Sequence, residues 1–273
     1  MGLLNRRREM GGKKDFDGFL IKGKWTDDST AADWWFKFNY YTQIDLTDFT
    51  NPDTKEFEYK TEVKPTTLRT LFYHNNAIER IDRLKGTENC TSLALGLYNN
   101  SLVHADLSEA IFNVPVDFSN LCWGGTSLTD LYFSDSPIIL SAVNYILNGA
   151  TKISTLKSNS FDTSGCTNFH CLLWHCEKLE ELDMNLDFSK ATDVGAMFDG
   201  CKKLTSMNGR VSNLSQSIRI EAPFDNASAM KFINALVDVG EERTITFSKT
   251  TFGSLTEEQI KKATDKGWNV LSI

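Results

Sequence analysis

The chain lacks several features that would place it in common functional classes. No run of about twenty apolar residues occurs, so no membrane span is expected. No apolar segment follows the charged first residues, so we expect no secretory signal. Acidic residues outnumber basic ones, 36 against 29, and the formal net charge is −7. This balance disfavours a reader of nucleic acid, whose binding face is usually basic.

Motifs for nucleotide binding and catalysis are also missing. The chain has no phosphate-binding loop of the Walker type, no dinucleotide-binding glycine fingerprint and no Gly-x-Ser-x-Gly nucleophile elbow. The early acidic residues Asp15, Asp17, Asp27 and Asp28 lack the glycine and closing glutamate of a calcium-binding loop. We therefore predict no catalytic residue and no cofactor, and we expect the protein not to be an enzyme.

Cysteine is too sparse for a disulfide scaffold, which is normally shorter and richer in cysteine. The strongest candidate metal site is the cluster Cys166, His170, Cys171, His175 and Cys176, because cysteine and histidine are zinc ligands. These side chains fall on different faces of one short expected helix and could not all reach one ion. We predict no metal site here.

What the chain does contain is a repeat. Residues 167–179 align with residues 192–204, an offset of 25. The same apolar pattern can be traced through six repeats, and its fifth position shows the period: Ile78, Leu102, Leu128, Ile153, Leu179 and Leu204. Within a repeat, the first four positions are spaced i, i+3, i+4 and i+7, which is typical of two helical turns with one buried face.

This spacing predicts the fold class. Each repeat is expected to be a short helix, a turn and a short strand, which can bury its apolar stripe only by stacking on its neighbours. The weakest repeat is the second, where we assign the inward positions to Ser92, Leu95, Gly96 and Asn99. The overall prediction is an α/β solenoid of about six helix-turn-strand repeats, with a small β-rich N-terminal element and an α/β C-terminal cap.

Two segments resemble a known family. Cys176-Glu-Lys-Leu179-Glu-Glu-Leu182 and Met197-Phe198-Asp-Gly-Cys201-Lys-Lys-Leu204 are similar to the BspA-like, or Treponema-type, leucine-rich repeat. The likeness is specific over residues 161–209 and weaker over 66–160, where the cysteine position holds alanine, glycine or asparagine. The resemblance implies an extended, curved leucine-rich-repeat protein used for binding on bacterial or viral surfaces.

The two flanks of the repeat region have different patterns. Residues 13–65 are rich in aromatic side chains, with alternation over 35–40 and 56–60 that predicts strands. We interpret this segment as a β cap or attachment element, with an aromatic carbohydrate platform as the alternative. In residues 210–273, Thr256 and Gln259 form a predicted capping box and Gly267 a helix stop. A helix from Asn226 and strands at 244–247 and 268–271 complete the predicted cap.

The first twelve residues are expected to be an anchoring arm. They resemble the openings of virion-surface proteins from phages of Bacteroidetes, and Gly11-Gly12 supplies a hinge. Arginine binds carboxylates in a bidentate manner and leucine can anchor in a groove, so the predicted partner-binding residues are Leu3, Leu4, Arg6, Arg7 and Arg8. The alternative is an unstructured tail.

These features predict four segments: an arm over 1–12, a β-rich element over 13–65, repeats over 66–209 and a cap over 210–273. The favoured function is a structural component of a bacteriophage virion, such as a fibre, decoration protein or tail appendage, assembled in the host cytoplasm. Its arm would bind other virion proteins, its repeats would bind host surface glycan or protein, and a homo-oligomer or symmetric assembly is expected. The alternatives are an adhesin on the bacterial cell surface and a glycan hydrolase.

Overall fold

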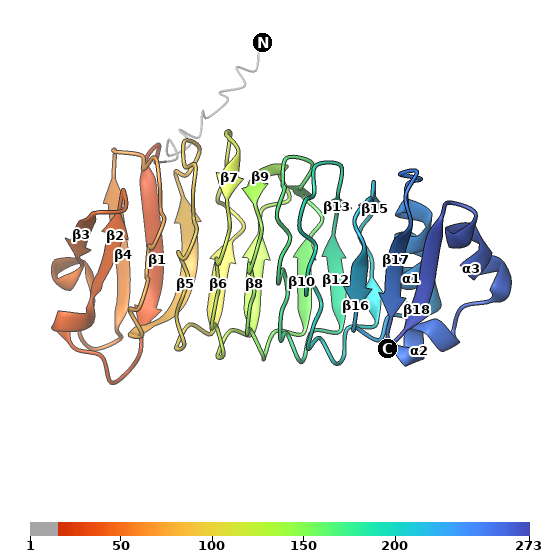
Figure 1. Cartoon of the computed structure of the whole chain (residues 1–273). Coiled ribbons are helices and arrows are strands. Elements are labelled where there is room, and N and C mark those ends of the chain that lie inside the picture. Colours follow the sequence, from red (N-terminus) through yellow and green to blue (C-terminus); the bar gives the residue numbers. More distant parts are fainter. Residues whose placement is uncertain (1–15) are drawn as a thin grey trace, which may run out of the picture.

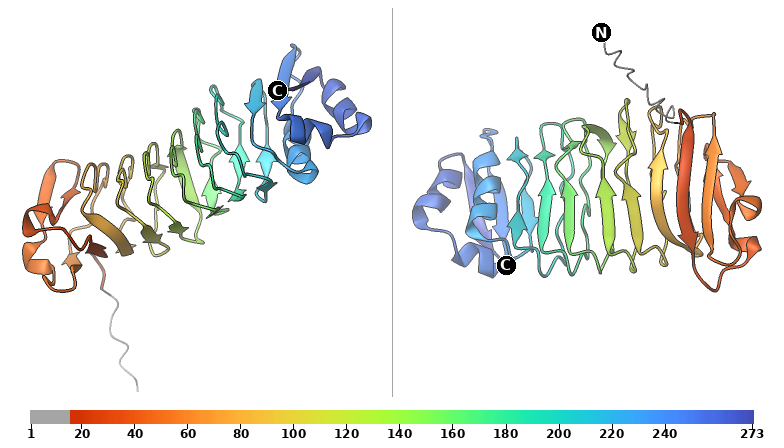
Figure 2. Two further views of the ribbon diagram at one scale, coloured as in Figure 1. Left: turned by 90° about the horizontal axis from the view of Figure 1, so that it is seen from below. Right: turned by 180° about the vertical axis from the view of Figure 1, so that it is seen from behind.

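A computed structural model describes residues 16–273 of the chain. These residues form an elongated array made mainly of strands, with eighteen strands and three short α-helices (Figure 1). The strands of successive repeats lie side by side along the long axis, and the helices gather at the C-terminal end. Seen from below, the successive repeats form a row of similar loops (Figure 2).

Each repeat contributes strands to more than one small sheet. One row contains β5 (Ile78–Lys85), β6 (His104–Leu107), β8 (Asp130–Phe133), β10 (Thr155–Ser158), β12 (Glu181–Met184) and β14 (Ser206–Met207). Another contains β7 (Val116–Asp117), β9 (Ile138–Ala142), β11 (Phe161–Asp162), β13 (Leu186–Asp187) and β15 (Val211–Ser212). Within the sheets that these rows form, neighbouring strands from successive repeats pair in parallel.

The sequence period appears as the offset between paired residues. Leu156 on β10 pairs with Leu182 on β12, which pairs with Met207 on β14, so the steps are 26 and 25 residues. All three side chains are buried. Apolar residues at this period therefore stack along the array into one core, which continues from Phe19 to Trp268.

The predicted fold class, an α/β leucine-rich-repeat solenoid of helix-turn-strand repeats, is wrong. The described chain is mostly strand, arranged in several small parallel or mixed sheets, and none of its α-helices lies within residues 66–209. The segments expected to be helical are runs of turns. Their backbone adopts positive φ at intervals, for example 62° at Thr70 and 59° at His74, and an α-helix cannot pass through such residues.

The hydrogen bonds of a turn run explain why the apolar stripe resembled a helix. In the first run, the N–H groups of Leu71 and Asn75 donate to carbonyls three residues earlier. The N–H groups of Leu68, Thr70, Phe72 and His74 instead donate to carbonyls of the next repeat. The stripe faces inward, as expected, but half of the local N–H groups bind the neighbouring repeat and not their own turn.

The second repeat differs from the predicted register. Its buried residues include Leu93, Ala94 and Leu97, whereas Ser92 and Leu95 are only half-buried. Inter-repeat hydrogen bonds align Leu93 with the inward position of the neighbouring repeats, since its N–H donates to Asp117 as that of Leu68 donates to Ser92. Between its last inward residue, Leu97, and its buried asparagine, Asn99, this repeat is one residue shorter than the first repeat between Phe72 and Asn75. A constant spacing counted back from Asn99 therefore places the earlier inward positions one residue too early.

The N-terminal segment is an antiparallel β element joined to the first repeat. Strand β1 (Phe19–Trp25) lies between β4 (Glu56–Thr61) and β5 and pairs with both. Strands β2 (Trp35–Phe38) and β3 (Thr42–Asp45) form a hairpin, and short 3-10 turns occur at Ala31–Asp33 and Thr47–Phe49. The rings of Phe19, Trp25 and Phe36 are fully buried. Most of the large aromatic side chains of this segment therefore supply core, as expected for a cap, whereas Tyr41 and Phe49 are exposed.

At the C-terminal end, β16 (Ile218–Ile220), β17 (Arg243–Phe247) and β18 (Trp268–Ser272) form a parallel sheet. Helices α1 (Asn226–Ala235), α2 (Lys249–Gly253) and α3 (Glu257–Thr264) connect these strands. The predicted capping box is confirmed: Thr256 accepts a hydrogen bond from the N–H of Gln259, and the Gln259 side chain accepts one from the N–H of Thr256. No helix within residues 16–273 has the length and apolar character needed to span a bilayer.

Candidate functional site

The predicted arm lies outside the described residues. This applies to Leu3, Leu4, Arg6, Arg7 and Arg8, whose assignment as partner-binding residues stays a prediction. The site described below comes from residues 16–273 alone.

The cysteine and histidine cluster is not brought together around one point. Cys166, Cys171 and Cys176 are buried, whereas His170 lies against Asp193 and His175 lies against the ring of Trp174. Among the residues that the structure describes, no group of three or more histidine, cysteine, aspartate or glutamate side chains is arranged to hold a metal ion.

Burial makes the cysteines unreactive. The thiol of Cys176 donates to the carbonyl of Leu147, and that of Cys201 donates to the carbonyl of Leu173. Burial raises the pKa of Cys90, Cys166 and Cys201 to about 12, and it raises the pKa of Cys176 as well. A thiol with so high a pKa carries little of the nucleophilic thiolate near neutral pH.

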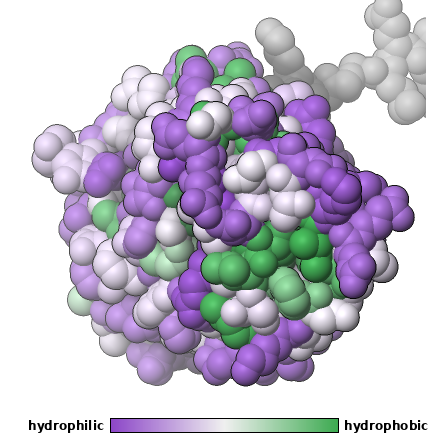
Figure 3. Space-filling view, turned by 45° about the vertical axis from the view of Figure 1, so that its right-hand side comes forward, coloured by the Kyte–Doolittle hydropathy of each residue, from purple (hydrophilic) through white to green (hydrophobic). Residues whose placement is uncertain are grey.

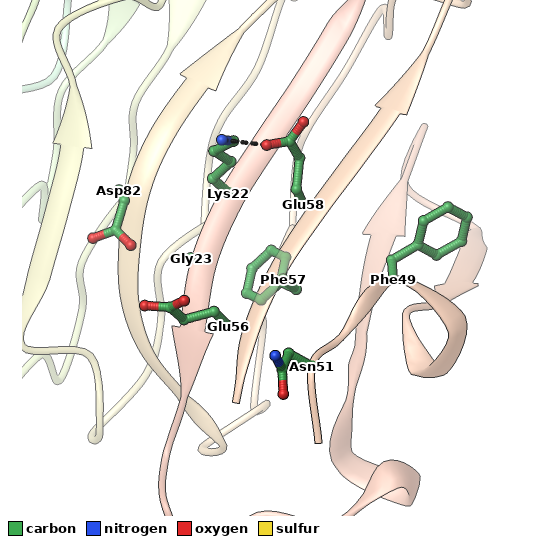
Figure 4. Close-up of a pocket in the computed structure, with 8 residues that line it drawn as sticks. All are labelled: Lys22, Gly23, Phe49, Asn51, Glu56, Phe57, Glu58 and Asp82. Carbon is green, nitrogen blue, oxygen red and sulfur yellow. Dashed lines mark ion pairs between the residues drawn. The ribbon is translucent and has the colours of Figure 1, made fainter. Parts of the chain in front are cut away.

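A shallow hollow lies over β1, β4 and β5 near the N-terminal end (Figure 4). Glu56 and Asp82 project on either side of Gly23, where the strand has no side chain, and Glu58 lies further along β4. Two carboxylates beside a cleft are what a glycan hydrolase needs, so this is where that alternative would have to be placed.

Two of the three carboxylates of this hollow, Glu58 and Asp82, take part in surface ion pairs. Glu58 contacts both Lys22 and Lys60, and one oxygen of Asp82, Oδ1, accepts hydrogen bonds from Nε and Nη2 of Arg80 at 2.9 and 2.7 Å. The geometry favours a charged surface at this place over a catalytic pair.

The most extended feature of the surface is a row of aromatic rings on the turn runs. We call it the aromatic ladder and define it as Tyr73, Tyr98, Trp123, Tyr145 and His170. Its members come from five consecutive repeats. Successive ring centroids are 5.1, 5.8, 6.0 and 5.5 Å apart, so each ring contacts the next.

The rings differ in orientation along the ladder. Trp123 meets Tyr98 nearly edge to face, at 83°, and lies within 26° of parallel to Tyr145. Trp123 is 43% exposed, and the other four members are half-buried. The ladder therefore presents both ring edges and ring faces, anchored on a hydrogen-bonded backbone that holds them at fixed spacing.

Polar partners flank the last members. The His170 ring lies 3.3 Å from the carboxylate of Asp193. Burial, together with the neighbouring Cys171 thiol, raises the pKa of Tyr145. Aromatic rings beside such polar groups are typical of surfaces that bind ligands or partners.

A second exposed apolar surface lies at the C-terminal end of the array. Figure 3, which brings that end forward, shows apolar side chains gathered there. Among the exposed large apolar residues of this region are Leu271, 51% exposed, and Ile273, 40% exposed, at the end of β18. Nothing in the structure indicates what would cover them, so we place no site there.

The aromatic ladder was missed in the sequence although a signal for it exists. Tyr73, Tyr98 and Trp123 are spaced by 25 residues, the period of the repeat itself. The fold prediction depends only on the inward positions of the stripe, whereas these rings occupy the outward position next to Phe72, Leu97 and Cys122. A large aromatic side chain that recurs at an outward position has no packing role in the core and indicates a surface role.

Comparisons of the chain with protein families, with curated proteins and with solved structures found no match. The resemblance to BspA-like repeats and that of the arm to virion-surface proteins therefore stay predictions, and the function has to be argued from the site.

Proposed function

We propose that the chain is a non-enzymatic structural component of a bacteriophage virion. Residues 1–12 anchor it to other virion proteins, and its elongated array presents a binding edge outward, toward the host surface or a neighbouring subunit. The protein occurs in the particle as a homo-oligomer or on symmetric sites. The adhesin of a bacterial cell surface is the competing assignment.

The observation that carries the binding role is the aromatic ladder. It places five rings from consecutive repeats in one continuous row on an edge of the array. Large aromatic side chains are enriched in binding surfaces because they offer much contact area at low cost in conformational entropy. A repetitive row of this kind suits a ligand that is itself extended and repetitive.

The virion assignment is tested on purified particles of the phage that encodes the chain. Mass spectrometry of such particles is expected to detect the protein in a fixed ratio to the major capsid protein. A chain in which residues 1–12 are replaced by a Gly/Ser segment of equal length is expected to fold normally and to be absent from particles.

The control is the full chain with Trp123→Ala, which alters the ladder and leaves the arm intact, and it is expected to enter particles normally. Normal incorporation of the chain without its arm sequence would overturn the anchoring role. Recovery of the protein only in the host cell envelope, and never in particles, would favour the adhesin.

A further inference from the structure

We infer that the aromatic ladder is the binding site for an uncharged, linear polysaccharide. This inference rests on the proposed binding role of the same edge and names its ligand class. Three independent features of the edge support it: its lack of charge, a strip without side chains beside Trp123, and its period.

The first feature is the absence of charged side chains from the segments that carry the ladder. Residues 70–78, 92–105, 118–129 and 136–151 contain no Asp, Glu, Lys or Arg, although 24% of the whole chain is charged. Charge returns at the far end, where Asp193 lies against His170 and Glu177, Lys178 and Asp199 follow. An acidic or basic polymer would require complementary charges along its path, and the edge offers none over four repeats.

The second feature is a strip formed by Gly124 and Gly149, which follow the tips of two successive repeats. Both glycines have positive φ, 71° and 76°. The equivalent residues in the first and fifth repeats are His74 and His175, with φ of 59° and 58°. The backbone therefore accepts a side chain at this place, and the glycines are not explained by conformation alone.

The space around both glycines could also hold larger side chains. A Cβ atom on Gly149 would come no nearer than 3.8 Å to Gly124, and one on Gly124 would lie 3.6 Å from the Asn100 side chain. The backbone is thus bare next to Trp123, and Tyr98 borders it, since its ring lies 3.7 Å from the same ideal Cβ position. A ligand can approach the rings from this side without displacing protein atoms.

The third feature is the match between the edge and a sugar chain. Parallel strands are separated by about 4.8 Å, and the ladder advances one ring per repeat. The distance between successive repeats is therefore close to the length that one sugar unit adds to an extended pyranose chain. The apolar C–H face of a sugar packs on an aromatic ring, and hydroxyls bind amides. Asn76 and Asn100, both exposed on the same edge, supply amide donors and acceptors.

The test uses the purified full chain in affinity gel electrophoresis with soluble polysaccharides. Mannan, arabinoxylan and laminarin are the neutral probes, and alginate is the acidic one. The wild-type chain is expected to be retarded by at least one neutral polymer and to migrate in alginate as it does in an empty gel. Titration with that polymer then gives the dissociation constant for each variant.

Three variants locate the site. Trp123→Ala is expected to weaken binding by at least about tenfold, because it removes the most exposed ring of the ladder. Gly149→His is expected to weaken it similarly by filling the bare strip with the side chain that the fifth repeat carries there. Tyr132→Ala is the matched control: this ring is 49% exposed but lies on β8, outside the turn runs that carry the ladder, and its loss should change binding less than about twofold.

Each outcome decides the inference. Failure of all three neutral polymers to retard the chain overturns it, as does retardation by alginate alone. Equal binding by wild type and Gly149→His also overturns it, and this variant decides the matter if Trp123→Ala unfolds. Particle incorporation without sugar binding would leave the virion assignment standing and remove only this inference. Sugar binding without incorporation into particles would support this inference and overturn the virion assignment.

Discussion

Asn99 donates a side-chain hydrogen bond to the main-chain carbonyl of Asn75, the asparagine of the preceding repeat. Both asparagines are buried. Asn75 in turn donates to the carbonyls of Asp33 and Trp35, at 3.0 and 2.8 Å, and so joins the first repeat to the N-terminal element. The two side chains form a continuous polar link through the core at the boundary between two differently built parts of the chain.

Replacement of this link should be costly. Asn75→Ala leaves the partly buried carbonyls of Asp33 and Trp35 and the N–H of Ala77 without this partner, so the free energy of unfolding is expected to fall by about 2–3 kcal/mol. Urea unfolding followed by tryptophan fluorescence measures this loss. Asn76→Ala, at the exposed neighbouring position, should change stability by less than about 0.5 kcal/mol. A similar effect from both substitutions would contradict the role assigned to Asn75.

Gly209 should not tolerate any side chain. A Cβ atom there would lie 1.9 Å from the carbonyl oxygen of Met184 and 2.3 Å from its carbonyl carbon, both in the backbone of the preceding repeat. Gly209→Ala is expected to lower stability by about 3 kcal/mol, because neither backbone can move without disturbing its repeat.

The matched substitution is Gly253→Ala, at the last residue of α2, where no atom lies within 4 Å of an added Cβ. It is expected to leave stability unchanged or to raise it by up to about 1 kcal/mol. Thermal unfolding of both variants measures the contrast, and a stable Gly209→Ala protein would show that the repeats are not in such close contact.

Alkaline pH should destabilise the fold through its cysteines. In the unfolded chain a cysteine thiol has a pKa of about 8.5. In the folded protein, burial raises the pKa of Cys90, Cys166 and Cys201 to about 12. The folded state therefore holds protons that the unfolded state has lost. This stability is fully present below about pH 8.5 and is lost as the pH rises toward 12, by about 1.4 kcal/mol per pH unit for each thiol.

Urea unfolding under reducing conditions at about pH 7.5 and about pH 9.5 measures this dependence. Cys201→Ala should reduce the slope against pH by the contribution of one thiol, whatever its effect on stability at neutral pH. Equal slopes in wild type and variant would show that the thiol of Cys201 does not stay protonated in the folded protein.

The C-terminal end should depend on one pair of amides. Asn226 at the start of α1 and Gln259 in α3 donate to each other's side-chain oxygen, both at 2.9 Å, and Gln259 also completes the capping box. Gln259→Ala is expected to cost about 1–2 kcal/mol and to speed amide exchange in α3 more than in the repeats. Lys262→Ala, exposed on the same helix, is the control. Unchanged exchange in α3 would contradict this prediction.

The parts of the fold that could be predicted from the sequence are those that depend on residues close together in the chain. The capping box of Thr256 and Gln259 was predicted because both partners lie within four residues. The strands at 35–38 and 56–61 were predicted because alternation is a local pattern. The inward stripe was predicted as a set of buried positions, but its secondary structure and the register of the second repeat were wrong.

The turn runs could not be recognised because their cause is not local. Thr70, Asn120, Tyr145, Cys171 and Ala196 all adopt positive φ, and most of these residue types carry no signal for that conformation. They do so because alternate N–H groups find acceptors in the next repeat, a contact about 25 residues away. The ladder could have been found from the spacing of Tyr73, Tyr98 and Trp123, but its ring contacts follow from the same long-range stacking.

The direction of the bonds between turn runs determines how the array responds to force. In the first five runs the N–H groups that leave the repeat donate to the next one along the chain. Successive repeats follow one another along the long axis of the molecule (Figure 1). Tension applied between the two ends therefore pulls these bonds along their length, one repeat at a time, and does not shear many together. An array built this way lengthens by losing repeats from one end, while the repeats still stacked keep their shape.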